Sequence, residues 1–141
     1  MTTWGEPPGE PVTLAGREAC AVPEAFLKNL GPWLMGLPFS LTVCDEKGTI
    51  LYMNDRADRS FESQGGKTLV GSNLLDCHPE PAKTRLGEIM EKQERNAYTV
   101  EKKGTRRLIF QSPWYRDGVY AGFFELILPL PENLPHFIRK G

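Results

Sequence analysis

Apolar residues in this chain change their spacing along the sequence, and the order of the changes restricts the folds that the chain can adopt. Residues 23–36 have helical spacing, two runs with a period of two follow, a second helical stretch comes next, and three β-like runs complete the pattern. Tight-turn residues such as Lys103-Gly104 separate the last three runs. Strands joined by tight turns are antiparallel, so the order predicts an α+β domain with a five-stranded antiparallel sheet and helices inserted between strands 2 and 3.

Glycine and proline set the boundaries that we expect for these segments. Residues 1–22 contain several prolines and no sustained period, which predicts a flexible lead-in, and residues 23–36 form an N-terminal helix that Pro32 should kink or interrupt. The folded domain covers residues 37–128, and residues 129–141 leave the sheet as a tail. Within the domain we expect strands at 39–45, 49–53, 97–102, 106–114 and 119–128, and helices at 55–61 and 79–94.

Asn54 stands directly before the predicted helix 55–61. A side-chain oxygen at this position can accept a hydrogen bond from the free amides of the first helical turn, so Asn54 is predicted to be the N-cap of that helix. This structural role accounts for the residue without a catalytic function.

Composition argues against several classes of function. The 141 residues include 17 Lys and Arg and 18 Asp and Glu, and the formal net charge of −1 gives no excess positive field, so nucleic acid is not expected as a partner. Three cysteines at unrelated spacings indicate a reducing compartment rather than a disulfide framework. The sequence has no signal peptide and no apolar run of about 18 residues, so we expect a soluble cytoplasmic protein without a membrane span.

The segment from Asp45 to Ala57, DEKGTILYMNDRA, resembles the first hairpin of a PAS domain, which typically reads Asp-x-x-Gly-x-Ile-x-Tyr-x-Asn-x-x-Ala. The resemblance continues through residues 70–75 and 117–122 and spans about residues 37–128. Residues 74–82 are similar to standalone bacterial and archaeal PAS modules with a His-Pro pair before the long helix. The resemblance implies sensing or dimerisation rather than catalysis, so no enzymatic activity is expected.

The resemblance to PAS domains also implies a small pocket between the long helix and the sheet. We expect a small apolar or mixed-polarity ligand there, and the residues predicted to line the pocket are Leu75, His78, Leu86, Ile89, Met90 and Phe110. The ligand would act through different affinities for two states of the domain. The signal would pass to a separate signalling protein, because the domain leaves too few of the 141 residues for an output domain.

The last predicted strand is apolar on both faces over part of its length, so the face away from the pocket needs a cover. In PAS proteins a helix before the first strand commonly packs across the sheet and contributes to dimers. The residues of this helix predicted at a homodimer interface are Phe26, Leu30, Trp33 and Leu34. Packing of the helix within its own chain is the alternative.

Cys77 and His78 are adjacent, and both side chains can bind metals. Two interpretations stay open: a haem- or redox-active protein that uses this pair, or a histidine that contributes to a helix cap beside a small buried thiol. The resemblance disfavours two cofactors. Flavin photochemistry needs a cysteine where Leu74 stands, and histidine-ligated haem needs a histidine where Leu86 stands, so the cofactor is left unknown.

Overall fold

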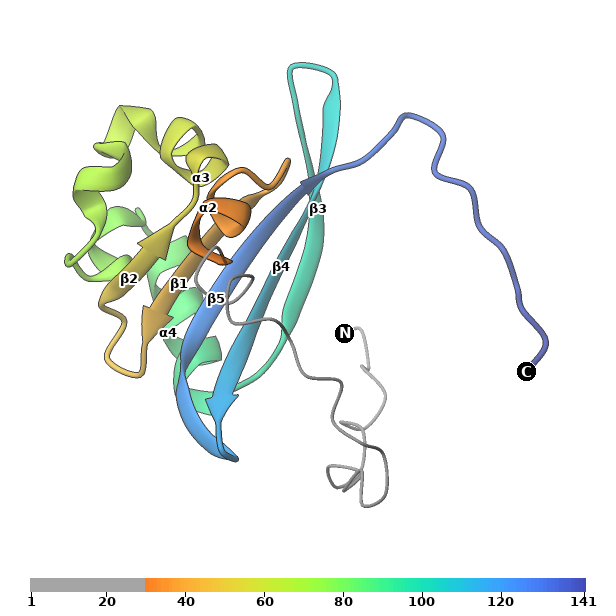
Figure 1. Cartoon of the computed structure of the whole chain (residues 1–141). Coiled ribbons are helices and arrows are strands. Elements are labelled where there is room, and N and C mark those ends of the chain that lie inside the picture. The colour runs from red at the N-terminus through yellow and green to blue at the C-terminus, as the bar shows by residue number, and fades with distance from the viewer. Residues whose placement is uncertain (1–29) are drawn as a thin grey trace.

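Five strands form one antiparallel sheet in the computed structural model, which describes residues 30–141 (Figure 1). The strands are β1 (Ser40–Asp45), β2 (Ile50–Met53), β3 (Asn96–Lys102), β4 (Thr105–Arg116) and β5 (Val119–Pro129). Their order across the sheet is β2-β1-β5-β4-β3. The helices follow β2 and precede β3 in the chain, as predicted, so the α+β fold with its five-stranded sheet is confirmed.

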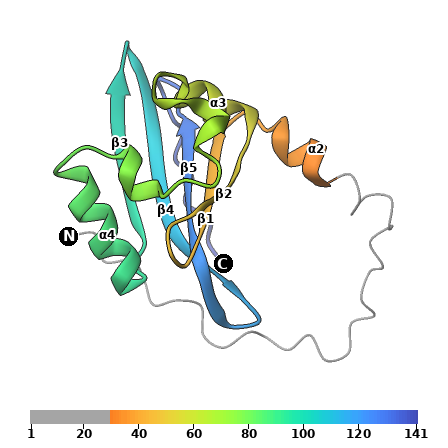
Figure 2. The same cartoon turned by 90° about the vertical axis from the view of Figure 1, so that its left-hand side faces the viewer.

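Within residues 30–141, three helices and three short 3₁₀ turns accompany the sheet. They are α2 (Leu30–Met35), α3 (Asp55–Ser60), η1 (Glu62–Gln64), η2 (Gly66–Leu69), η3 (Leu74–Cys77) and α4 (Ala82–Lys92). Figure 2 shows α2 and α4 on opposite sides of the sheet. The predicted lead-in 1–22 and residues 23–29 of the predicted N-terminal helix lie outside the described residues. No helix within residues 30–141 is long and apolar enough to cross a membrane.

The cross-strand register divides the sheet into an inner face, which α3 and α4 cover, and an outer face. Ser40, Thr42 and Cys44 of β1 are buried on the inner face, whereas Leu41 and Val43 are half-buried on the outer face. Alternate residues of a strand point to opposite sides of the sheet. The apolar alternation in the sequence of β1 therefore marks the outer face, and the inward-facing residues of β1 are small or polar.

Asn54 is fully buried and joins α3 to β1 through three side-chain hydrogen bonds. Its Oδ1 accepts from the amide of Ala57 (2.9 Å), which confirms the predicted N-cap, and from the amide of Leu41 (3.0 Å). Its Nδ2 donates to the carbonyl oxygen of Phe39 (2.7 Å). One side chain thus satisfies the first turn of α3 and the backbone at the start of β1, and it fixes the two elements against each other.

The last two strands, β4 and β5, extend further than the sequence pattern predicts. β4 continues two residues beyond the predicted end at Trp114, and β5 continues one residue beyond Leu128. The amide of Leu130 still donates to the carbonyl oxygen of Arg106 (2.9 Å). Residues 131–141 are exposed and extend away from the sheet (Figure 1).

We expect Asn54→Ala to lower the free energy of unfolding by about 3 kcal/mol, because the change leaves two buried amides and a carbonyl without their partner. Asn73→Ala is the matched control. Asn73 also caps a helical turn, at Leu75, but its bonds lie nearer to solvent, so its loss should cost about 1 kcal/mol. Urea denaturation measures both values, and equal losses would contradict the special role of Asn54.

Gly122 lies where β5 passes close to β1. Its φ is 144°, and a Cβ at this position would overlap the carbonyl oxygen of Cys44 and the backbone of Asp45. Gly122→Ala should therefore cost more than about 2 kcal/mol of stability. Gly118 also has a positive φ (78°) but no neighbour within 4 Å, so Gly118→Ala should cost only about 1 kcal/mol. Chemical denaturation measures the loss of stability in both variants. Equal losses would contradict the claim that the close approach of β5 to β1 requires glycine at position 122.

Candidate functional site

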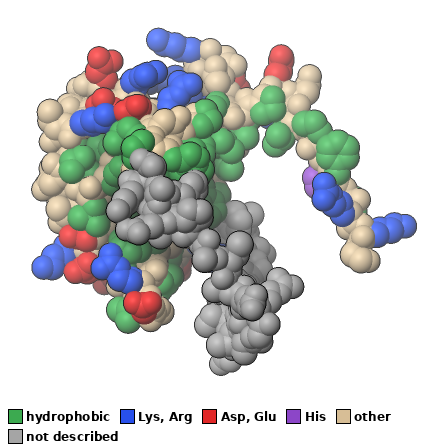
Figure 3. All heavy atoms as spheres, in the orientation of Figure 1, with side chains coloured by type: hydrophobic (Ala, Val, Ile, Leu, Met, Phe, Trp, Pro, Cys, Tyr) green, Lys and Arg blue, Asp and Glu red, His purple; other side chains and the backbone are tan. Residues whose placement is uncertain are grey.

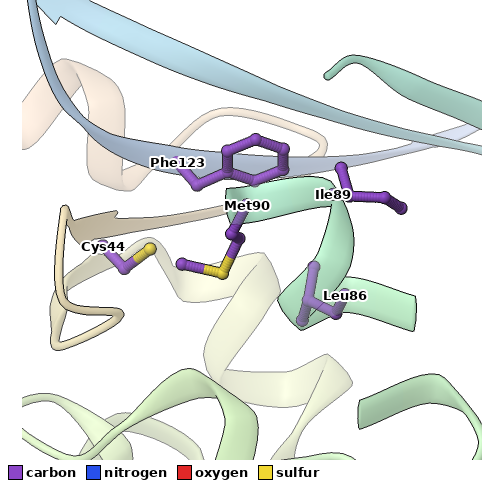
Figure 4. Close-up of a cluster of buried hydrophobic side chains, with 5 residues drawn as sticks. All are labelled: Cys44, Leu86, Ile89, Met90 and Phe123. Atoms are coloured by element: carbon purple, nitrogen blue, oxygen red, sulfur yellow. The ribbon is translucent and has the colours of Figure 1, made fainter. Parts of the chain in front are cut away.

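The first part of the candidate site is an apolar cluster between α4 and the inner face of the sheet. Leu86, Ile89 and Met90 of α4 form one buried cluster with Cys44 of β1 and Phe123 of β5, and Met90 extends toward Cys44 (Figure 4). All five side chains are at least nine-tenths buried. The helical spacing of the three α4 residues places them on one face of that helix, which explains why they meet the sheet together.

Four of the six residues predicted to line the pocket belong to this region. Leu86, Ile89 and Met90 are in the cluster, and Leu75 of η3 packs against it half-buried. The prediction for Phe110 is wrong. Its neighbour Ile109 is buried on the inner face, so Phe110 points to the outer face, where its ring lies 5.9 Å from that of Phe124.

A polar row beside the apolar cluster forms the second part of the site. Gln111 of β4 is buried, and its Nε2 donates to Oε2 of Glu125 on β5 (2.7 Å). Asn96 of β3 donates through Nδ2 to Oε1 of Gln111 (2.9 Å). The three residues stand opposite one another in the register, so the row runs across β3, β4 and β5 on the inner face.

Thr42 continues the polar row onto β1. It stands opposite Glu125 in the register and is only 3% exposed. Its Oγ1 is buried and has no hydrogen-bond partner within the described part of the chain. A buried hydroxyl without a partner costs free energy, so Thr42 is a destabilising member of this row.

Tyr98 of β3 lies at the edge of the site and is 45% exposed. Partial burial raises the pKa of its hydroxyl, the carboxylate of Glu125 raises it further, and the guanidinium of Arg85 on α4 opposes both effects. The hydroxyl therefore lies in the electrostatic field of one acid and one base that come from opposite sides of the site. Tyr98 stays protonated at neutral pH and can donate a hydrogen bond there.

The sequence analysis did not find the polar row. A signal was present, because Gln111 and Glu125 interrupt the apolar runs of two predicted strands. Their side chains share a face only through the register of β4 and β5, which periodicity does not give. The site therefore combines an apolar wall on α4 with a row of hydrogen-bonding groups on the sheet.

His78 lies beyond the cluster, directly after η3. Its Nδ1 lies 2.9 Å from the carbonyl oxygen of Leu74. Because a carbonyl oxygen can only accept, Nδ1 is the donor in this hydrogen bond, and Nε2 takes no part in it. The thiol of Cys77 faces the carbonyl oxygen of Asn73 (3.8 Å). The adjacent residues thus bond to successive carbonyls of the same turn, which agrees with a role in closing η3.

Cys44 has a different environment from Cys77. Burial raises the pKa of the Cys44 thiol to about 11, although a backbone hydrogen bond at Phe123 opposes the rise. The thiol is therefore protonated at neutral pH, and a protonated thiol is a poor nucleophile. Cys44 acts as a small apolar member of the cluster.

The four residues predicted at a dimer interface are only partly described. Phe26 lies outside the described residues, and Leu30 begins α2. Trp33 is 56% exposed and Leu34 is half-buried.

Comparisons with known proteins bear on the fold. No family model matches the chain, and no curated protein matches it. Among solved structures, a C-terminal domain from Streptococcus mutans has a TM-score of 0.62 at 16% identity, covering 73% of this chain and 84% of that one. The PAS domain of BvgS from Bordetella pertussis has a TM-score of 0.53 at 16% identity, covering 77% and 88%.

A third similar structure is the Aer2 receptor from Vibrio cholerae, described as a dual PAS-heme oxygen sensor. Its TM-score is 0.52 at 15% identity, and the match covers 70% of this chain and 99% of that one. At 15–16% identity these likenesses concern the fold alone. The chain has a PAS fold, which confirms the resemblance seen in its sequence at the level of the fold.

We expect Thr42→Val to raise the free energy of unfolding by about 1 kcal/mol, because valine has the shape of threonine without the unpartnered hydroxyl. Thr84→Val is the control, since Oγ1 of Thr84 donates to Glu80 (2.7 Å) on an exposed surface and its removal brings no gain. Thermal unfolding of ligand-free protein measures both. A loss of stability in Thr42→Val would show that the hydroxyl has a partner.

Proposed function

We propose that the chain is a sensory or signalling module that binds a small molecule of mixed polarity between α4 and the inner face of the sheet. The observation that carries the proposal is the buried, unpartnered hydroxyl of Thr42 at the end of the polar row Asn96–Gln111–Glu125. Apolar contact with α4 would supply affinity, and the polar row would orient the molecule. No catalytic role is proposed for any of these residues.

The edge of the site suggests how the ligand would affect the domain. The carboxylate of Glu125 on β5 and the guanidinium of Arg85 on α4 both act electrostatically on the hydroxyl of Tyr98. A ligand that bonds to Glu125 or Thr42 would change how α4 sits on the sheet only if it favours one arrangement over another. We propose that the ligand shifts the domain toward the arrangement that it binds more tightly. A separate signalling protein would recognise that arrangement.

Haem is the alternative occupant. The Aer2 receptor, which has a similar fold, is described as a PAS-heme oxygen sensor. Nε2 of His78 is the ring nitrogen that could reach a ligand, because Nδ1 faces the Leu74 carbonyl. Against this, the position at which the family resemblance expects the haem ligand is Leu86, which is 4% exposed within the apolar cluster. Redox chemistry at Cys77 belongs to the same alternative.

Native mass spectrometry of the protein purified from the cells that make it tests the proposal. Wild-type protein should retain an additional small mass, and Thr42→Val should retain it with about tenfold lower affinity, because one buried hydrogen bond is lost. Thr84→Val should behave as wild type. Equal retention by Thr42→Val would contradict the proposed site, and a Soret band that disappears in His78→Ala would favour the haem alternative.

We also propose that the module acts as a homodimer in the cytoplasm, with α2 at the interface. The exposed indole of Trp33 supports this, because a large apolar side chain more than half in water is suited to a partner surface. The cysteines of the described residues, Cys44 and Cys77, are both free, which is compatible with a reducing compartment.

Light scattering at high micromolar concentration tests the dimer. Wild-type protein should have twice the 15.9 kDa mass of one chain, and Trp33→Glu should become monomeric with an unchanged melting temperature. A wild-type monomer would contradict the dimer. Unfolding of Trp33→Glu would instead show that α2 covers its own chain.

A further inference from the structure

A hollow of about 310 Å³ lies between α3 and the tip of the β3–β4 hairpin, away from the candidate site under α4. Its lining residues are Arg56, Arg59, Ser60, Lys102, Lys103 and Arg107. Five of the six are basic, so the hollow holds 5 of the 17 Lys and Arg residues of the chain. Figure 3 shows Lys and Arg side chains gathered at the top of the molecule, where Figure 1 places the hairpin tip.

Local geometry explains why α3 presents its basic side chains to the hollow. Arg56, Arg59 and Ser60 are three and four residues apart, so they share one face of the helix. The acidic residues of α3, Asp55 and Asp58, do not line the hollow, because both accept hydrogen bonds from Lys67. Nζ of Lys67 donates to Asp55 (2.8 Å), and the amide of Lys67 donates to Asp58 (2.7 Å).

The hairpin supplies the other three cations through its register and its turn. Lys102 pairs with Thr105, and Arg107 pairs with Val100, so Lys102 and Arg107 lie on the face of the sheet that the helices cover. Lys103 and Gly104 form the two-residue turn, with φ of 52° and 72°. Two positive φ values are typical of a tight type I′ turn, which holds Lys103 in a fixed position beside its neighbour.

Within residues 30–141, no acidic side chain pairs with the cations of the hollow. No lining residue is acidic, and none of the five basic side chains forms an ion pair with any residue from 30 to 141. Like charges held close together repel one another, and a bound anion removes that repulsion. The concave shape also gives an anion several neighbours at once, unlike single cations scattered over a surface.

We propose that this hollow binds a small molecule with two or three linked phosphate groups. Three of the cations are arginines, whose planar guanidinium groups bind phosphate oxygens with two parallel hydrogen bonds. The lysines add point charges, and the hydroxyl of Ser60 can donate to a phosphate oxygen. The volume is within the range of small-molecule pockets, and five positive charges exceed what a single phosphate would neutralise.

An extended nucleic acid fits the hollow less well. Binding along a polymer uses a stripe of cations and often aromatic side chains on which bases stack. Here the cations converge on one concavity, and no aromatic residue lines it. The net charge of −1 does not reveal this hollow, because acidic residues elsewhere in the chain balance its five basic residues in the sum.

Isothermal titration calorimetry of the full chain with inorganic tripolyphosphate, at low and fixed ionic strength, tests the proposal. We expect saturable binding of one tripolyphosphate per chain, and at least tenfold weaker binding of inorganic monophosphate. Lys103→Asn and Arg59→Gln should each weaken tripolyphosphate about tenfold. Asparagine is favoured in a type I′ turn, so Lys103→Asn removes the charge while it keeps the hairpin.

Arg139→Gln is the matched control, because Arg139 is exposed in the extended tail and should bind as wild type. An equal loss in this control would show that tripolyphosphate responds only to total charge, and the proposal would be wrong. Absence of saturable binding in wild type would overturn it directly. So would tight binding of a single-stranded oligonucleotide that tripolyphosphate does not displace, since this would mark a surface for an extended polymer.

Discussion

The buried amide of Asn54 is the contact on which the arrangement of helices and sheet depends. It stands between β2 and α3 in the chain and bonds to the backbone on both sides of the entry to β1. An amide can donate and accept at once, which no apolar residue and no carboxylate can do in the same place. With α3 fixed in this way, the later turns lead to α4 over the centre of the sheet, and α3 stands beside the β3–β4 hairpin.

The inner face of the sheet is less apolar than the outer face, and the proposed ligand would lie on this inner face. Thr42, Gln111 and Glu125 lie under the helices, while Leu41 and Val43 lie on the other side. Polar groups in a core cost stability unless they have partners. Hydrogen bonds join Asn96, Gln111 and Glu125 of this row, whereas Thr42 at its end has no partner within residues 30–141.

Much of the fold could be predicted from local signals, and the site could be predicted only in part. The cap at Asn54 and the turn at Lys103-Gly104 depend on neighbours in sequence, so they were predicted correctly. Phe110 was placed on the wrong face because β4 is apolar on both faces around it, and a period of two assigns no direction there. The polar row joins strands through their register, and the basic hollow joins α3 to a distant hairpin, so neither follows from local sequence patterns.

A high-resolution crystal structure of the protein as purified is the most direct test of the central claim. The account predicts a bound molecule between α4 and β5 that accepts or donates a hydrogen bond at Oγ1 of Thr42 and lies against Met90. It would be contradicted by a hydroxyl of Thr42 bonded to another protein group with the space around it filled by side chains.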